Sequence, residues 1–214
     1  MTTKTKRRAF DDPKWTKADL LAQVLAHREA DQLIHGIYWQ HGKGCAVGCM
    51  SHTDRQPHAV LARRYGIDER LFHLCDAIFE NLPNEESLVW PERFVEALPV
   101  GRDVSLAWHK FSAWLLSESG LLTITRQNRA AIERVRTLHI RAIDGNVPSA
   151  VEWEHARAEA RLAESTAWSA AAVAAQPAAA AAAARATAWS AAQSAVDSAW
   201  QRMSDKLVEV LEAA

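Results

Sequence analysis

Apolar residues recur at spacings of three and four along most of the chain, without a sustained alternation of apolar and polar positions. This period places apolar side chains on one face of an α-helix, so the pattern predicts an all-α fold. Helices are expected to begin after Thr16, at Pro57 and after Asp68, because hydroxyl and carboxylate groups cap helix N-termini and proline fits the first turn. Gly66 is expected to end the second of these helices.

Three further helices are expected between residues 84 and 144. Asn84 and Pro91 predict a broken or restarted helix, since proline removes a backbone donor from a helix interior. Asp103 is expected to cap the next helix, and Gly120 to end it. Residues 126–144 predict a strongly basic helix. Short connections between all these segments indicate a compact multi-helix domain.

The composition changes at Pro148, where Ser149 and Glu152 form a capping-box pattern at the start of an alanine-rich helix. Pro177 interrupts this helix and either kinks it or makes the turn of a helical hairpin. The chain is therefore expected to have three parts: a flexible basic N-terminus (1–13), a helical globular domain (14–146) and an Ala/Trp-rich helical arm (147–214).

The expected arm combines alanines, which favour helix formation, with large apolar side chains at helical spacing. Alanine buries little area, so these large side chains must supply most of the apolar contact. We expect them to form a surface that binds a partner or a second copy of the chain. Its residues are Trp168, Trp189, Val196, Trp200, Met203 and Leu207.

Composition narrows the class of protein further. The 214 residues are 49% hydrophobic and 24% charged, with a formal net charge of −1, which excludes a disordered chain, a collagen-like repeat and a strongly basic nucleic-acid binder. No signal peptide is visible, and the alanine run Ala178–Ala184 is far shorter than the roughly 20 apolar residues of a membrane span. Three cysteines do not suggest a disulfide framework. We expect a soluble, cytoplasmic protein with no membrane contact.

Residues 36–52 hold four of the eight glycines together with two cysteines and two histidines. One hypothesis is a metal site, with zinc as the ion, because imidazole and thiolate suit zinc. Its ligands would be His41, Cys45, Cys49 and His52.

Three other interpretations of this segment remain open. Cys45 could be a nucleophile with a nearby histidine as its base. Alternatively, Cys45 and Cys49 are small buried apolar residues, and the glycines let a tight loop pass between helices. Finally, the backbone around Lys43 could form an anion-binding nest.

The expected basic helix is a candidate phosphate-binding surface, because the arginine guanidinium matches phosphate geometry. Its candidate contacts are Arg126, Arg129, Arg134, Arg136 and Arg141. The competing interpretation is a solvated face, or one paired within the chain with acidic residues such as Glu152 and Glu154. We favour the second interpretation over a nucleic-acid interface.

Three segments resemble a family of uncharacterised bacterial and phage or prophage proteins that also end in Ala/Trp/Arg-rich helices. They are Tyr38-Trp39 with Gly42–Cys49 (GKGCAVGC), Trp90–Phe94 (WPERF) and Leu98–Gly101 (LPVG). The resemblance implies a mobile-element setting, and it assigns no activity, cofactor or catalytic residue.

Together these patterns predict a non-enzymatic protein of phage or mobile-element origin that binds a host or partner macromolecule, without a cofactor. A protein partner and a homo-oligomer formed through the arm are expected, and no catalytic residue is assigned. Two alternatives stay open. One is a small metal-dependent (zinc) or thiol-dependent enzyme centred on Cys45, and the other is a nucleic-acid-binding protein that uses the basic helix.

Overall fold

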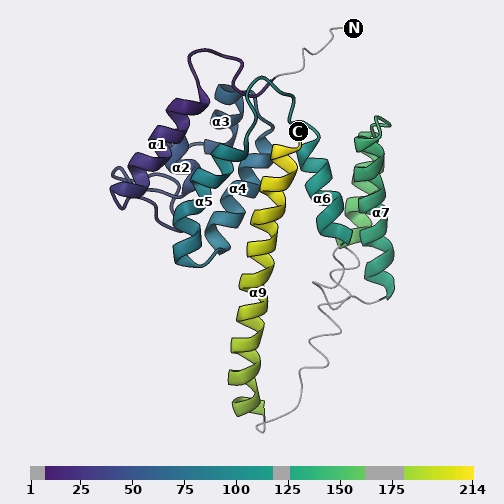
Figure 1. The fold of residues 1–214 in the computed structure, drawn as a ribbon. Coiled ribbons are helices and arrows are strands. Elements are labelled where there is room, and N and C mark those ends of the chain that lie inside the picture. Colours follow the sequence, from purple (N-terminus) through teal and green to yellow (C-terminus); the bar gives the residue numbers. More distant parts are fainter. Residues whose placement is uncertain (1–7, 118–125, 162–180) are drawn as a thin grey trace. The chain divides into compact units, whose positions relative to one another are not determined.

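The computed structural model describes residues 8–117, 126–161 and 181–214, except for the side chains of residues 126–128 and 181–196 (Figure 1). These residues form helices with short connections, and their extended segments amount to two isolated β-bridges, Leu33 with Gly44 and Gln40 with Lys43. The expected all-α fold is confirmed. The geometry at Pro177 and the first seven residues lie outside the described part of the chain.

Contacts divide the chain into two compact units, Met1–Trp108 with Trp200–Ala214, and His109–Ala199. This division differs from the expected boundary near residue 146. The basic helix belongs to the second unit, and the last turns of the C-terminal helix belong to the first.

The first unit contains α1 (Lys17–Glu29), α2 (Ala46–Ser51), α3 (Pro57–Tyr65), α4 (Glu69–Asn81), α5 (Asn84–Ala97) and the end of α9 (Ala181–Glu212). The caps expected at Thr16, Asp68 and Gly66 are present, whereas the helix expected after Asp103 begins only at Ala107, and Gly120 lies outside the described residues. The Thr16 side chain accepts a hydrogen bond from Asp19 N, Asp68 accepts one from Arg70 N, and Gly66 ends α3 with a φ of 67°. The expected break at Pro91 is wrong, because α5 continues through this residue as one helix.

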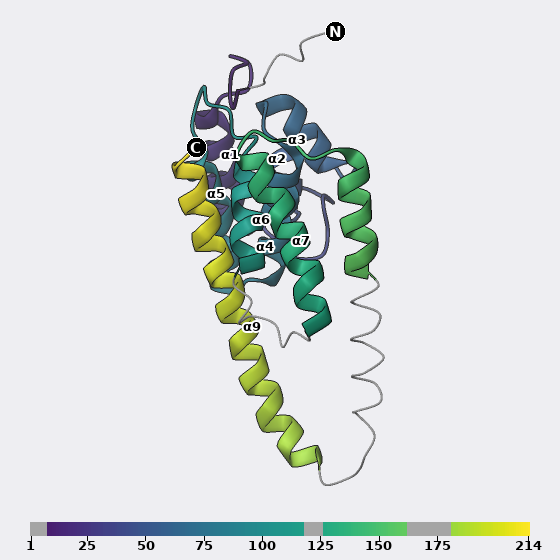
Figure 2. The same ribbon diagram turned by 90° about the vertical axis from the view of Figure 1, so that its right-hand side faces the viewer.

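The largest fully buried side chains of this unit lie on α4 and α5. Trp90 and Phe94 are fully buried, and the Trp90 indole N–H donates to the carbonyl of Cys75 at 2.9 Å. The end of α9 lies beside α5 in both views (Figures 1 and 2), and Arg93 and Asp205 form an ion pair of 2.9 Å between these two helices. The last turns of the chain therefore complete the first unit.

The second unit contains most of α6 (Ala107–Ser117), α7 (Arg126–Ile143) and a helix over residues 150–161. The capping box predicted at the start of the helix over residues 150–161 is confirmed. Ser149 N donates to Glu152 at 2.7 Å, and Glu152 N donates to Ser149 Oγ at 3.3 Å. His139 on α7 contacts the ring of Trp153 at a centroid distance of 4.9 Å.

Candidate functional site

The glycine-rich segment folds back on itself before α2 begins. Gln40 N donates to Lys43 O at 2.8 Å, and Lys43 N donates to Gln40 O at 3.0 Å. His41 and Gly42 between them both have positive φ, 51° and 80°, as a type I′ turn requires. This tight loop returns the chain to Cys45, which becomes the N-cap residue of α2.

The loop lies so close to α2 that two positions accept only glycine. A Cβ atom added to Gly48 would lie 1.3 Å from the carbonyl oxygen of Tyr38, and one added to Gly44 would lie 1.9 Å from it. Cys45 and Cys49 are 1% and 0% exposed. Both cysteines are therefore buried beside a closely packed loop that depends on glycine, as one of the interpretations expected.

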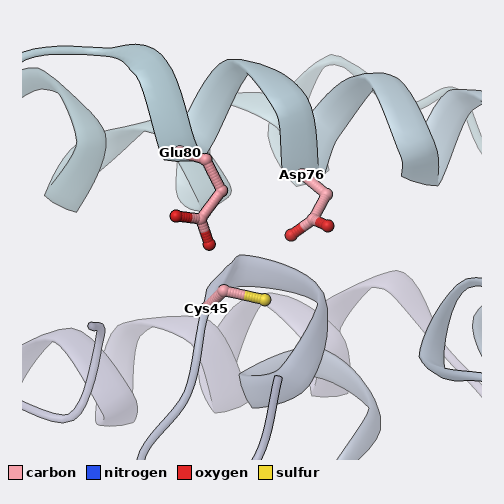
Figure 3. Close-up of side chains that lie close together, drawn as sticks. All are labelled: Cys45, Asp76 and Glu80. Atoms are coloured by element: carbon pink, nitrogen blue, oxygen red, sulfur yellow. The ribbon is translucent and has the colours of Figure 1, made fainter. Parts of the chain in front are cut away.

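Cys45 nevertheless has chemistry of its own, because two carboxylates of α4 point toward it (Figure 3). Asp76 and Glu80 are four residues apart and thus lie on the same face of α4. One ligand atom from each of Cys45, Asp76 and Glu80 lies within 4.8 Å of the other two. Together they form a group of three side chains of types that can ligate a metal, one from the N-cap of α2 and two from α4.

Burial and the surrounding carboxylates favour the protonated form of Cys45. Burial raises the pKa of the Cys45 thiol well above its usual range, the charge of Asp76, a hydrogen bond to Asp76 and the charge of Glu80 raise it further, and a backbone hydrogen bond at Gly48 counteracts part of this rise. A nucleophilic cysteine needs a lowered pKa, which a neighbouring cation or an adjacent base provides. The cluster therefore opposes the thiol-nucleophile interpretation of Cys45.

The two oxygens of Asp76 have different surroundings. Oδ2 lies 3.2 Å from His58 Nε2, within hydrogen-bonding distance. Oδ1 is buried and has no hydrogen-bond partner among the described residues. A buried carboxylate oxygen without a partner costs free energy unless a donor or a cation satisfies it.

Glu80 forms the outer edge of the cluster. Both of its carboxylate oxygens accept the N–H of Gly36, at 2.9 and 3.1 Å. Burial raises the pKa of Glu80, the hydrogen bond from Gly36 counteracts this, and the charge of Asp76 adds to the rise. A cavity of about 310 Å³ adjoins the two carboxylates and is lined by Gly36, Ile37, Tyr38, Asp76 and Glu80.

The structure does not bring together the four ligands predicted from sequence, His41, Cys45, Cys49 and His52. His41 is exposed in the turn, and the buried Cys49 thiol donates to the carbonyl of Gly44 at 3.4 Å. His52 pairs with a different residue, His27, at 2.7 Å between their Nε2 atoms. Cys45 alone reaches the cluster, and Asp76 and Glu80 were missed.

The pair of His27 and His52 links the end of α1 to the end of α2. Trp39 stacks on His52 with a centroid distance of 4.7 Å, and His27 Nδ1 lies 2.6 Å from Gln32 Oε1. Burial lowers the pKa of His52, and the neighbouring His27 and Arg64 lower it further. A hydrogen bond between two imidazoles needs at least one neutral ring, so acid opposes this contact.

We expect the first unit to lose stability as the pH falls below about 6.5, the usual histidine pKa. The folded-state pKa of His52 is lowered, so the unfolded chain takes up the proton first and is favoured by acid. Urea unfolding at pH 7, 6 and 5 should show a weaker dependence on pH for His52→Gln than for the wild type. His41→Gln, at an exposed turn position, is the control, and an unchanged pH dependence in His52→Gln would contradict the expectation.

The basic helix, α7, is paired within its own unit. Arg129 is exposed, and the side chain of Arg126 lies outside the described residues. The remaining three arginines form ion pairs with glutamates: Arg134 with Glu159 (2.8 Å), Arg136 with Glu133 (2.9 Å) and Arg141 with Glu152 (2.5 Å). Arg141 and Ser149 lower the pKa of Glu152 to about 2. The intramolecular interpretation is confirmed for these three arginines.

The expected partner-binding surface of the arm is described only in part. Leu207 is fully buried in the core of the first unit, so its side chain does not contribute to an exposed surface. Trp200 and Met203 are half-buried. Trp168 and the side chains of Trp189 and Val196 lie outside the described residues, and the protein partner and the homo-oligomer stay predictions.

Comparison of the chain with models of protein families, with curated proteins and with solved structures finds no match. Among the helices of the described residues, none combines the length and the apolar character needed to cross a membrane. The function therefore has to be argued from the cluster itself.

Proposed function

We propose that the protein binds a divalent transition-metal ion of the zinc class through Cys45, Asp76 and Glu80. The observation that carries this proposal is the convergence of the three ligand atoms within 4.8 Å, next to a buried Asp76 oxygen that has no partner among the described residues. A cation placed among them would satisfy that oxygen and offset the negative charges that the fold brings together.

The donor set favours zinc over magnesium or calcium. Zinc binds thiolate, imidazole and carboxylate ligands, usually four in a tetrahedral arrangement, whereas magnesium and calcium prefer sets made only of oxygen. Three protein ligands leave one position for water or an external ligand, and the cavity at Gly36, Ile37 and Tyr38 adjoins two of the ligands. A zinc site with three protein ligands and one open position differs from a structural zinc site, in which the protein supplies all four ligands.

Binding would deprotonate Cys45, because the thiolate is the form that ligates metals. The raised pKa of this thiol means that a proton must leave as the ion enters. Affinity for the ion should therefore rise with pH, and one proton should be released from the thiol for each ion bound.

Cobalt(II) titration of the full-length protein tests the proposal. The wild type should bind one equivalent and show the near-ultraviolet charge-transfer absorption of a thiolate–cobalt bond. We expect Cys45→Ala to lose this absorption completely, and Cys49→Ala to keep it, because Cys49 is equally buried but lies outside the cluster.

The two cysteine variants distinguish the cluster from the site predicted by sequence. Circular dichroism should first establish that both variants retain their helices. Loss of the absorption in Cys49→Ala, or its persistence in Cys45→Ala, would contradict the assignment. A wild-type protein that binds neither cobalt nor zinc would overturn the proposed function altogether.

A further inference from the structure

His58 stands next to the cluster in a fixed orientation. It is the second residue of α3, after Pro57, and is 5% exposed. Its ring stacks on that of His73 with a centroid distance of 3.8 Å and an interplanar angle of 21°. The Tyr38 ring meets it edge-on at 5.5 Å and 87°. Ring contacts from two other segments thus restrict how the imidazole can turn.

This orientation directs His58 Nε2 at one oxygen of Asp76. The distance to Oδ2 is 3.2 Å, and the donor has to be the imidazole, because a carboxylate only accepts. The other oxygen, Oδ1, is the buried one without a partner among the described residues. The hydrogen bond therefore occupies one oxygen of Asp76 and leaves the other for a ligand.

His58 is not itself a member of the ligand cluster. Among the described residues, the group of ligating atoms within 4.8 Å of one another consists of Cys45, Asp76 and Glu80. In known metal sites, residues that do not touch the ion often form hydrogen bonds to a ligating carboxylate and fix its orientation. His58 lies in such a position relative to Asp76.

We propose that His58 is a positioning residue of the metal centre: its Nε2–H holds Asp76 Oδ2, so that Asp76 Oδ1 faces the ion bound with Cys45 and Glu80. This inference rests on the proposed function, because it assigns a role within the same site.

Two substitutions separate the hydrogen bond from the ring packing. His58→Phe keeps an aromatic ring between His73 and Tyr38 but removes the donor. His58→Gln keeps a donor at a position comparable to Nε2 but removes the ring. His41→Gln is the control, because His41 is an exposed histidine of the same unit that belongs neither to the cluster nor to the ring contacts of His58.

Cobalt(II) affinity and the visible spectrum of the bound ion provide the readouts, with zinc competition for tight binding. We expect His58→Phe to bind cobalt about 10- to 100-fold more weakly, with altered visible bands, as for other outer contacts of metal ligands. His58→Gln should stay within a few-fold of the wild type, and His41→Gln should match the wild type in both readouts.

The outcomes separate this inference from the proposed function. If the wild type binds no cobalt, both fail. If the wild type binds cobalt through Cys45 and His58→Phe binds it equally well with the same spectrum, only the role of His58 is overturned. Should His58→Phe not fold, His58→Gln decides: near wild-type binding supports the hydrogen bond, and a loss of tenfold or more overturns it.

Discussion

Gly48→Ala is expected to destabilise the first unit by about 4 kcal/mol or more, which places it among the largest effects of a single substitution. The added Cβ would lie 1.3 Å from the carbonyl oxygen of Tyr38 and 2.4 Å from its carbonyl carbon. Neither atom belongs to a flexible side chain, so the loop has to leave α2. Urea unfolding followed by circular dichroism measures the loss, and cobalt binding should fail with it, because the displaced loop adjoins Cys45.

Gly36→Ala is the matched control for this prediction. Gly36 lies in the same loop and has a φ of 81°, but a Cβ there would have no neighbour within 4 Å. Its cost is therefore conformational alone, about 1–2 kcal/mol. Equal losses in the two variants would contradict the steric argument, since they would show that backbone strain and not the contact with Tyr38 sets the cost.

The helices could be predicted from sequence because their boundaries depend on nearby residues. Thr16 and Asp68 cap their helices through hydrogen bonds to amides two or three positions away, and Gly66 ends α3 through its own backbone conformation. Pro91 shows the limit of this local reasoning. A proline inside a helix removes one backbone hydrogen bond, but the burial of Trp90 and Phe94 on either side of Pro91 stabilises α5 as one helix.

The candidate site was less predictable, because its ligands come from distant parts of the chain. Cys45 was recognised in an unusual glycine-rich segment, whereas Asp76 and Glu80 look like the polar face of an amphipathic helix. Their spacing of four residues can be read from the sequence. It does not distinguish ligands from surface residues, because such pairs are common on solvated helix faces. They become candidate ligands only because the turn at His41 and Gly42 returns the chain to α4.

The C-terminal helix shows a different limit. Its apolar stripe is buried only in the last turns of the helix, and a stripe does not reveal whether the surface that covers it belongs to the same chain. Leu207, Val210 and Leu211 are buried in the first unit, and Arg102 donates to the carbonyl of Ala214 at 2.8 Å. These last turns are therefore not available to a partner, and the expected interface has to lie in the part of the arm that precedes them.

Leu207→Ala is expected to destabilise the first unit by about 2–5 kcal/mol, the usual cost of removing a fully buried leucine side chain. Urea unfolding measures this loss, and light scattering of the folded protein should show an unchanged mass, because Leu207 packs within its own chain. Arg202→Ala, at an exposed position of the same helix, should change neither quantity. A variant of Leu207 that keeps its stability but lowers the mass of the assembly would instead place this residue between copies of the chain.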